Sequence, residues 1–164
     1  MQSWHAGDEY GHTRNGNNNW YGHDNEMTHF DWDPSTEQAD FFAYTAALIN
    51  FRKQCPLLGR DEFLAPDEIT WHETNWDNAE SKFLAFTLHG KKYDYGDLYC
   101  AINAHSSNVM VDLPPPQSGH KWCRLSDTNL GPERVWVEGG NKGVEPAYTV
   151  TGRSCVLLVS KPDA

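Results

Sequence analysis

The sequence predicts a mainly β fold, in which an antiparallel β-sandwich follows a long loop and one helix. Short apolar or alternating segments recur after Gly59, with turns rich in Pro and Gly between them. Residues 35–55 repeat apolar side chains at helical spacing. Residues 7–34 are rich in Gly, Asn, Asp and Pro without periodicity, which is typical of a loop. We therefore expect two domains, residues 1–58 and residues 59–164.

The composition indicates an ordered and acidic protein. The 164 residues include 7 Trp, 7 Tyr and 7 Phe, whereas disordered chains are poor in aromatic side chains. The formal net charge is -10, and nucleic acids and anionic membranes bind basic surfaces, so we expect neither as a partner. No apolar run approaches the roughly 18 residues that a membrane helix needs. The first six residues do not have the pattern of a signal peptide.

The cysteines occur singly, without a CxxC pair, at Cys55, Cys100, Cys123 and Cys155. Three of them lie in apolar, strand-like segments, where a free cysteine behaves as a small hydrophobic residue. We expect four reduced thiols, and hence a reducing compartment, rather than disulfides.

The loop segment 7–24 combines the side chains that a carbohydrate site uses. It interleaves carboxylates, three consecutive asparagines, aromatic rings and histidines, and it contains no aliphatic residue. Sugar hydroxyls need paired donors and acceptors, and the apolar face of a sugar ring needs a flat surface. The segment therefore predicts contact with a sugar.

Two groups in this loop allow alternative interpretations. Asp8 and Glu9 form a carboxylate pair, but adjacent residues rarely aim both carboxylates at one atom. We expect one to structure the loop and the other to face solvent or sugar. The asparagines 17–19 either bind hydroxyl groups through their amides or simply suit tight turns.

The same region also contains side chains that could bind a metal ion. Histidines and carboxylates alternate there, but their spacings match no zinc template. The residues concerned are His5, His12, His23 and His29 with Asp8, Asp24 and Asp31. We expect no metal and no cofactor.

Residues 35–55 predict one helix with an apolar face. Ser35 can cap the N-terminus, with Gln38 three residues later as in a capping box. Arg52 and Lys53 fall in the last turn, where the helix dipole favours cations, and Pro56 ends the helix. The apolar face is Phe41, Tyr44, Leu48 and Phe51, with Phe42, Thr45 and Ile49 beside it, and we expect it to need a partner surface.

Seven short segments predict strands: 69–72, 82–89, 98–104, 108–113, 121–126, 148–150 and 155–160. Their spacing and turns favour an antiparallel sandwich. In the second of these, we expect the more apolar face to point into the core, and that face is Leu84, Phe86 and Leu88. Residues 156–159 predict a buried strand.

Trp71 and Trp76 flank the start of the predicted sandwich. Exposed tryptophans can stack on sugars, which would make this a carbohydrate-binding surface. They can also cover the edge of a core or a domain interface, and the sequence leaves both interpretations open.

Two motifs, GDEYGHT at residues 7–13 and GNNNWYGHD at residues 16–24, carry a family likeness. They resemble the segment after the eighth barrel strand of isoamylase-type starch and glycogen debranching enzymes, in the α-amylase superfamily. The likeness continues through the predicted helix and extends over about residues 7–160. The sequence is similar to plant and algal isoamylases in particular at residues 70–78, 81–87, 102–105 and 127–130.

The resemblance implies that residues 1–58 are a remnant of a (β/α)8 barrel, consisting of the loop after strand eight and helix eight. Residues 59–164 would be the C-terminal antiparallel sandwich. Active sites of such barrels lie on the loops at the C-terminal face, so the loop would line the substrate cleft. The implied substrate-binding residues are Asp8, Glu9, Asn17, Asn18, Asn19, Tyr21 and Asp24.

The resemblance also implies that this chain holds no catalytic residue. The nucleophilic Asp, the acid Glu and the third catalytic Asp of the family lie on barrel strands four, five and seven, which this sequence does not contain. We expect the chain to be a portion of an enzyme that hydrolyses α-1,6 branch linkages, inactive alone. The implied partners are α-glucans such as amylopectin or glycogen, and other isoamylase subunits, and the implied location is the plastid.

Two rival functions remain. A free-standing carbohydrate-binding module would hold glucan on the tryptophan-flanked sandwich without any enzyme. A purely structural domain would dock on a barrel and touch no sugar.

Overall fold

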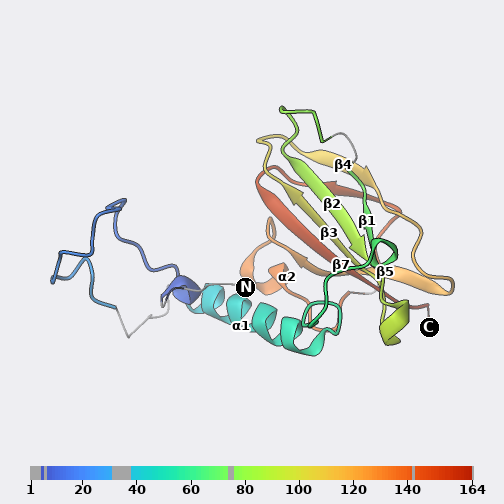
Figure 1. Cartoon of the computed structure of the whole chain (residues 1–164), viewed down its shortest axis with the longest axis horizontal. Coiled ribbons are helices and arrows are strands. Elements are labelled where there is room, and N and C mark those ends of the chain that lie inside the picture. Colours follow the sequence, from blue (N-terminus) through green and yellow to red (C-terminus); the bar gives the residue numbers. More distant parts are fainter. Residues whose placement is uncertain (1–4, 6, 31–37, 74–75, 142, 164) are drawn as a thin grey trace. The chain divides into compact units, whose positions relative to one another are not determined.

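The computed structural model describes residues 5, 7–30, 38–73, 76–141 and 143–163 (Figure 1). Their internal contacts define two compact units, Met1–Phe51 and Arg52–Ala164. The domain boundary expected between residues 58 and 59 stays a prediction. Within the described residues, no helix is long and apolar enough to cross a membrane.

The first unit consists of a loop and most of one helix. A single 3-10 turn, η1 (Asp8–Tyr10), opens the loop, and residues 11–30 form turns and bends without a strand. The helix α1 (Ala39–Gln54) follows, with Arg52 and Lys53 in its last turn as predicted. The expected cap Ser35 lies outside the described residues.

The helix α1 buries little of its apolar surface. Thr45 is its buried residue, whereas Phe41 and Phe42 are 44% and 48% exposed. Tyr44 and Leu48 are half-buried. The aromatic surface at the start of α1 is thus still available to a partner, as the sequence pattern indicates.

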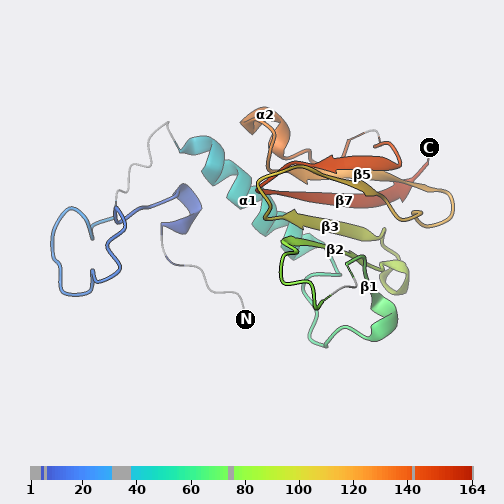
Figure 2. The same cartoon turned by 90° about the horizontal axis from the view of Figure 1, so that it is seen from above.

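The second unit is built on a five-stranded antiparallel sheet in the order β1-β2-β3-β7-β5 (Figure 2). These strands are β1 (Ile69–Trp71), β2 (Phe83–Leu88), β3 (Leu98–Asn103), β7 (Ser154–Pro162) and β5 (His120–Asp127). The long strand β7 lies between β3 and β5, so the last strand along the sequence is an interior strand of the sheet.

A smaller two-stranded sheet pairs β4 (Val109–Asp112) with β6 (Ala147–Val150) and packs against the larger sheet (Figure 1). The core between them combines Val150 of β6 with Ala101, Val156 and Leu158 of the large sheet, all essentially without exposed surface. All seven predicted strands are present, each within two residues of its expected ends. The mainly β, sandwich-like fold is therefore confirmed.

The sequence did not predict the short helical turns between the strands. They are η2 (Pro66–Glu68), η3 (Lys91–Tyr93) and α2 (Pro132–Val135). The four cysteines are free thiols, and Cys55 and Cys123 are buried. Residues 156–159 form a mostly buried part of β7, as predicted.

The prediction for the faces of β2 was wrong for Leu84 and Phe86, which lie outside the core cluster, although Leu88 is buried. Ala85 packs in the core, and Thr87 is buried on the same face, where it bonds to His72. Phe86 lies on the opposite face and contacts Trp71, with 5.4 Å between ring centroids. The core side already holds the large rings of Tyr99 and Trp122, so small side chains of β2 fit there. The outer face of β2 is also apolar. A count of apolar residues therefore cannot tell which face of the strand points into the core.

Candidate functional site

The carboxylate pair predicted in the loop lies in the 3-10 turn η1. Gly7 precedes the turn and Gly11 ends it, with φ angles of 97° and 73° that favour glycine. Asp8 accepts a hydrogen bond from the backbone N–H of His5 (3.0 Å), and Glu9 accepts one from that of Gly7 (2.9 Å). Both carboxylates therefore structure the turn, and Asp8 remains exposed.

The polar run of the loop is held by short-range bonds. The side chain of Asn17 accepts a bond from the N–H of Asn19 (2.9 Å) and donates to the Met27 sulfur (3.3 Å). Asn18 and Asn19 are exposed, and Tyr21 is 84% exposed. The presence of an asparagine at position 17 is thus explained by its role in a tight turn, whereas Asn18 is exposed to solvent.

Asp24 forms an exposed pair with His29, with 3.1 Å between Oδ1 and Nε2. Across the described residues, no group of three or more His, Cys, Asp and Glu could hold a metal ion. The predicted site residues thus divide between η1 and the later turns, and most of their bonds stay within two to five residues, apart from the bond from Asn17 to Met27.

His12 is a residue of this loop that the prediction of substrate-binding residues missed. Its ring contacts Phe30 at 5.4 Å between centroids, and its Nε2 atom is buried without a hydrogen-bond partner among the described residues. A buried polar nitrogen of this kind normally pairs with another group. The signal in the sequence was its position in the GDEYGHT motif.

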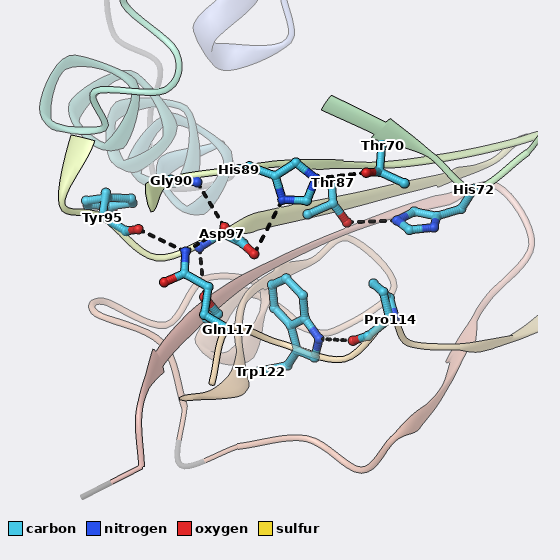
Figure 3. A network of polar contacts seen from close by, with 11 residues as sticks. Thr70, His72, Thr87, His89, Gly90, Tyr95, Asp97, Pro114, Gln117 and Trp122 are labelled. Carbon is cyan, nitrogen blue, oxygen red and sulfur yellow. Dashed lines mark hydrogen bonds and ion pairs between the residues drawn. The ribbon is translucent and has the colours of Figure 1, made fainter. Parts of the chain in front are cut away.

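A second polar cluster, absent from the sequence predictions, lies at one end of the large sheet (Figure 3). Asp97, only 7% exposed, accepts bonds from the N–H of Gly90 (2.9 Å) and the side-chain amide of Gln117 (2.6 Å). Its own N–H donates to the hydroxyl of Ser160 (2.7 Å). His89, which directly follows β2, approaches it with 3.5 Å between Nδ1 and Oδ2. The Asp97 cluster thus joins segments from β2 to β7.

A cavity of about 590 Å³ adjoins this cluster and is lined by Asp67, Glu68, His89, Lys91, Lys92, Asp97 and Gln117. Glu68 is 7% exposed and accepts hydrogen bonds from the Ala65 N–H (2.8 Å), Arg60 (2.9 Å) and Lys92 (3.1 Å). The Ala65 bond, followed by the two cations, lowers the pKa of Glu68 to about 2.

The chemistry of this cavity does not suit glycoside hydrolysis. A catalytic acid needs a raised pKa so that it holds a proton at neutral pH, whereas the pKa of Glu68 is lowered. Asp97 is committed to hydrogen bonds that hold neighbouring segments together. The cluster therefore stabilises the end of the sheet, and the loop remains the candidate for substrate contact.

A family model described as "Isoamylase, C-terminal" matches residues 60–159, which include every strand of the sandwich up to most of β7. The fold is thus that of the β domain found at the C-terminal side of isoamylases. The chain belongs to the isoamylase C-terminal domain family.

Relatives extend the likeness to nearly the whole chain. It is 45% identical over 157 residues to isoamylase 3 (chloroplastic) of Oryza sativa subsp. japonica, covering 95% of this chain and 20% of the relative. It is 38% identical to isoamylase SU1 (chloroplastic) of Zea mays, covering 97% and 22%. It is 31% identical to the isoamylase of Pseudomonas amyloderamosa, covering 95% and 22%. The chain thus spans about a fifth of the length of these relatives.

Solved structures support the fold. A type I pullulanase from Bacillus subtilis str. 168, complexed with maltose, superposes with a TM-score of 0.71 at 19% identity, covering 94% of this chain and 20% of that one. A pullulanase from Bacillus acidopullulyticus gives a TM-score of 0.65 at 23% identity, covering 93% and 18%. At these identities the likeness concerns the fold alone.

Proposed function

We propose that this chain is the C-terminal part of an α-glucan debranching enzyme that hydrolyses α-1,6 branch linkages. The observation that carries the proposal is the match to plant and bacterial isoamylases along at least 95% of the chain but only about a fifth of their length. On this view the sandwich stabilises the enzyme, and the catalytic carboxylates lie in segments that this sequence does not contain.

The loop would contribute part of the substrate cleft of the complete enzyme. Its support is chemical: the exposed amide of Asn18, the exposed ring of Tyr21 and the carboxylate of Asp24 offer an acceptor, donors and a flat apolar face. The buried Nε2 of His12, which has no hydrogen-bond partner among the described residues, would find one in the complete enzyme. Asp8 and Glu9 would hold the turn that presents the loop.

A chimera tests the proposal. The matching C-terminal fifth of rice isoamylase 3 is replaced by this chain, and release of reducing ends from amylopectin is measured. We expect the chimera to debranch amylopectin and the isolated chain to release nothing. Activity of the isolated chain, or an inactive chimera that folds and unfolds like the rice enzyme, would overturn the proposal.

The role of the loop is tested in the same chimera. Asn18→Ala and Tyr21→Ala remove exposed groups without breaking the bonds that hold the turns, and each should lower kcat/KM on amylopectin by about tenfold. Glu26→Ala, at an exposed carboxylate of the same loop outside both motifs, should leave kcat/KM unchanged. Equal kcat/KM values for all three variants would show that the loop does not line the substrate cleft.

Plastid location and assembly with other isoamylase subunits belong to the same proposal. The rice and maize relatives are both chloroplastic by name. In the complete enzyme the exposed rings of Phe41 and Phe42 on α1 would pack against the rest of the barrel, so assembly would use other surfaces. Imaging of a fluorescent fusion of the complete coding sequence tests the location, and co-purification with a plant isoamylase tests the assembly. Cytosolic fluorescence, or monomeric elution of the mixed proteins, would contradict these parts.

A further inference from the structure

Three aromatic rings form a continuous cluster on the outer face of the large sheet at its β1 edge. Trp76, in the connection from β1 to β2, meets Trp71 of β1 at 5.6 Å between centroids and an interplanar angle of 83°. Trp71 in turn contacts Phe86 of β2 at 5.4 Å. The three rings Trp71, Trp76 and Phe86 are called the aromatic corner below.

The aromatic corner is open to solvent. Trp76 is 63% exposed and Trp71 is 44% exposed, while Phe86 is half-buried beneath them. Indole rings are large apolar surfaces, and leaving two of them in contact and exposed forgoes the stabilisation that burial would bring. An exposed apolar patch bordered by polar side chains is typical of a binding site.

The border of the corner is polar and mostly acidic. The connection from residue 73 to residue 82 carries the carboxylates of Glu73, Asp77 and Glu80 against the single ammonium group of Lys82. Asp77 and Glu80 are exposed. This charge repels nucleic acids, phosphates and anionic membranes, whereas carboxylates accept hydrogen bonds readily from hydroxyl groups.

Local hydrogen bonds organise the described part of this connection. The side chain of Asn78 accepts a bond from the N–H of Glu80 (3.1 Å), and its carbonyl accepts one from the N–H of Ser81 (3.0 Å). The hydroxyl of Ser81 donates to Glu73 (3.4 Å). Asn78, Glu80 and Ser81 are thus held by a defined turn, so less ordering of this segment is needed on binding.

A ligand that fits this site has apolar ring faces, many hydroxyl groups and no negative charge, which describes a neutral sugar chain. The two indole rings are nearly perpendicular, so they present two surfaces that meet at an angle rather than one flat surface. A curved chain can touch both surfaces, whereas a flat, extended chain can lie on only one.

We propose that the aromatic corner of Trp71 and Trp76 is a binding site for a curved, α-linked glucan chain, built from residues other than those of the loop at residues 7–30. The choice of α-glucan rests on the proposed function; the preference for a neutral, hydroxyl-rich and curved ligand rests on the corner itself. The site would hold the polymer by its surface while the complete enzyme acts on branch points.

The test uses the chain itself and maltoheptaose as the probe. Binding is followed by calorimetry and by the indole N–H signals in an NMR spectrum. We expect Trp76→Ala and Trp71→Ala to weaken maltoheptaose binding by about tenfold or more. Trp136→Ala is the matched control, because Trp136 bridges to β5 at the opposite edge of the sheet, and it should leave the affinity unchanged within about twofold.

Two further measurements keep the test decisive. Trp76→Phe retains a flat ring and should recover most of the affinity even if the alanine variants lose stability. Cellopentaose, a β-linked and flatter chain, should bind at least about tenfold more weakly than maltoheptaose. Undetectable maltoheptaose binding, equal binding by the folded Trp76→Ala variant, or a preference for cellopentaose would each overturn the proposal.

The outcome can be separated from that of the proposed function. An inactive chimera with a chain that still binds maltoheptaose through Trp76 would reject the debranching role and keep the site. An active chimera whose Trp76→Ala variant loses thermal stability while the chain's affinity for maltoheptaose is unaffected would identify the corner as a packing surface instead.

Discussion

The two units of the chain satisfy their polar groups in opposite ways. In the sheet unit, buried polar side chains bond to residues far away in sequence. Asn103 donates to the carbonyl of Val150 (3.0 Å), and Tyr148 donates to Asp127 (2.7 Å). In the loop at residues 7–30, side-chain hydrogen bonds mostly join residues two to five positions apart. The sheet unit therefore specifies its own fold, whereas the loop has local turns but few long-range contacts that fix it as a whole.

Hydrogen exchange gives the largest expected contrast between the units. The amides of β3 and β7, in the middle of the sheet, should exchange only through global unfolding, at about 5–15 kcal/mol. Amides of residues 7–30 should exchange with almost no protection, because their bonds span single turns. Slow exchange throughout the loop of the isolated chain would show that the loop is ordered by itself.

The Asp97 cluster provides the next largest effect. Asp97→Ala leaves the buried N–H of Gly90 and the amide of Gln117 without their acceptor, so the free energy of unfolding should fall by about 3–5 kcal/mol. Urea denaturation measures the change. Asp112→Ala, at an exposed position of β4, is the control and should change stability by less than about 0.5 kcal/mol. A similar small change for both variants would show that the cluster does not hold the sheet.

The sequence could predict the strands but not this cluster. Alternation and turn residues are local, so all seven strands are visible in a short window. The partners of Asp97 are Gly90, Gln117 and Ser160, which come together only after the sheet has formed. The available signals were weak: an acidic residue directly before the apolar strand β3, and a serine within the apolar strand β7.

The wrong assignment of the β2 faces has a related cause. The rule of alternation assumes one apolar face, but both faces of β2 are apolar. Leu84 and Phe86 lie half-buried on the outer face, where Leu88 is buried, while Ala85 and Thr87 line the core on the other face. Volume decides between the faces, because Tyr99 and Trp122 fill the core side. For the loop, residue types predict sugar chemistry, but the structure shows that Asp8, Glu9 and Asn17 bond to their own turns first.

The dependence of the free energy of unfolding on pH below 4.5 is set in part by Glu68. Its pKa is lowered from 4.5 in the unfolded chain to about 2 in the folded one, so the folded state favours the ionised form. Its stabilising contribution is fully present above pH 4.5 and is lost as the pH falls from 4.5 toward 2. Glu68→Gln should flatten this part of a plot of unfolding free energy against pH.

The exposed Glu145 provides the control, since Glu145→Gln should leave the slope between pH 4.5 and pH 2 unchanged. The slopes are measured by urea denaturation in a series of buffers. If the wild type and Glu68→Gln have the same slope of unfolding free energy between pH 4.5 and pH 2, then Arg60 and Lys92 do not bind Glu68 in solution.

The smallest expected effect is at the surface pair of Lys121 and Asp163, even though its 2.7 Å separation is shorter than those around Glu68. The side chains are 37% and 65% exposed, so water and salt screen the charges and both side chains must be ordered to meet. Asp163→Asn should leave the Tm unchanged within error at low and high salt. A clear, salt-sensitive loss of stability would show that short distance outweighs burial in this protein, and it would weaken the same reasoning for Glu68 and Asp97.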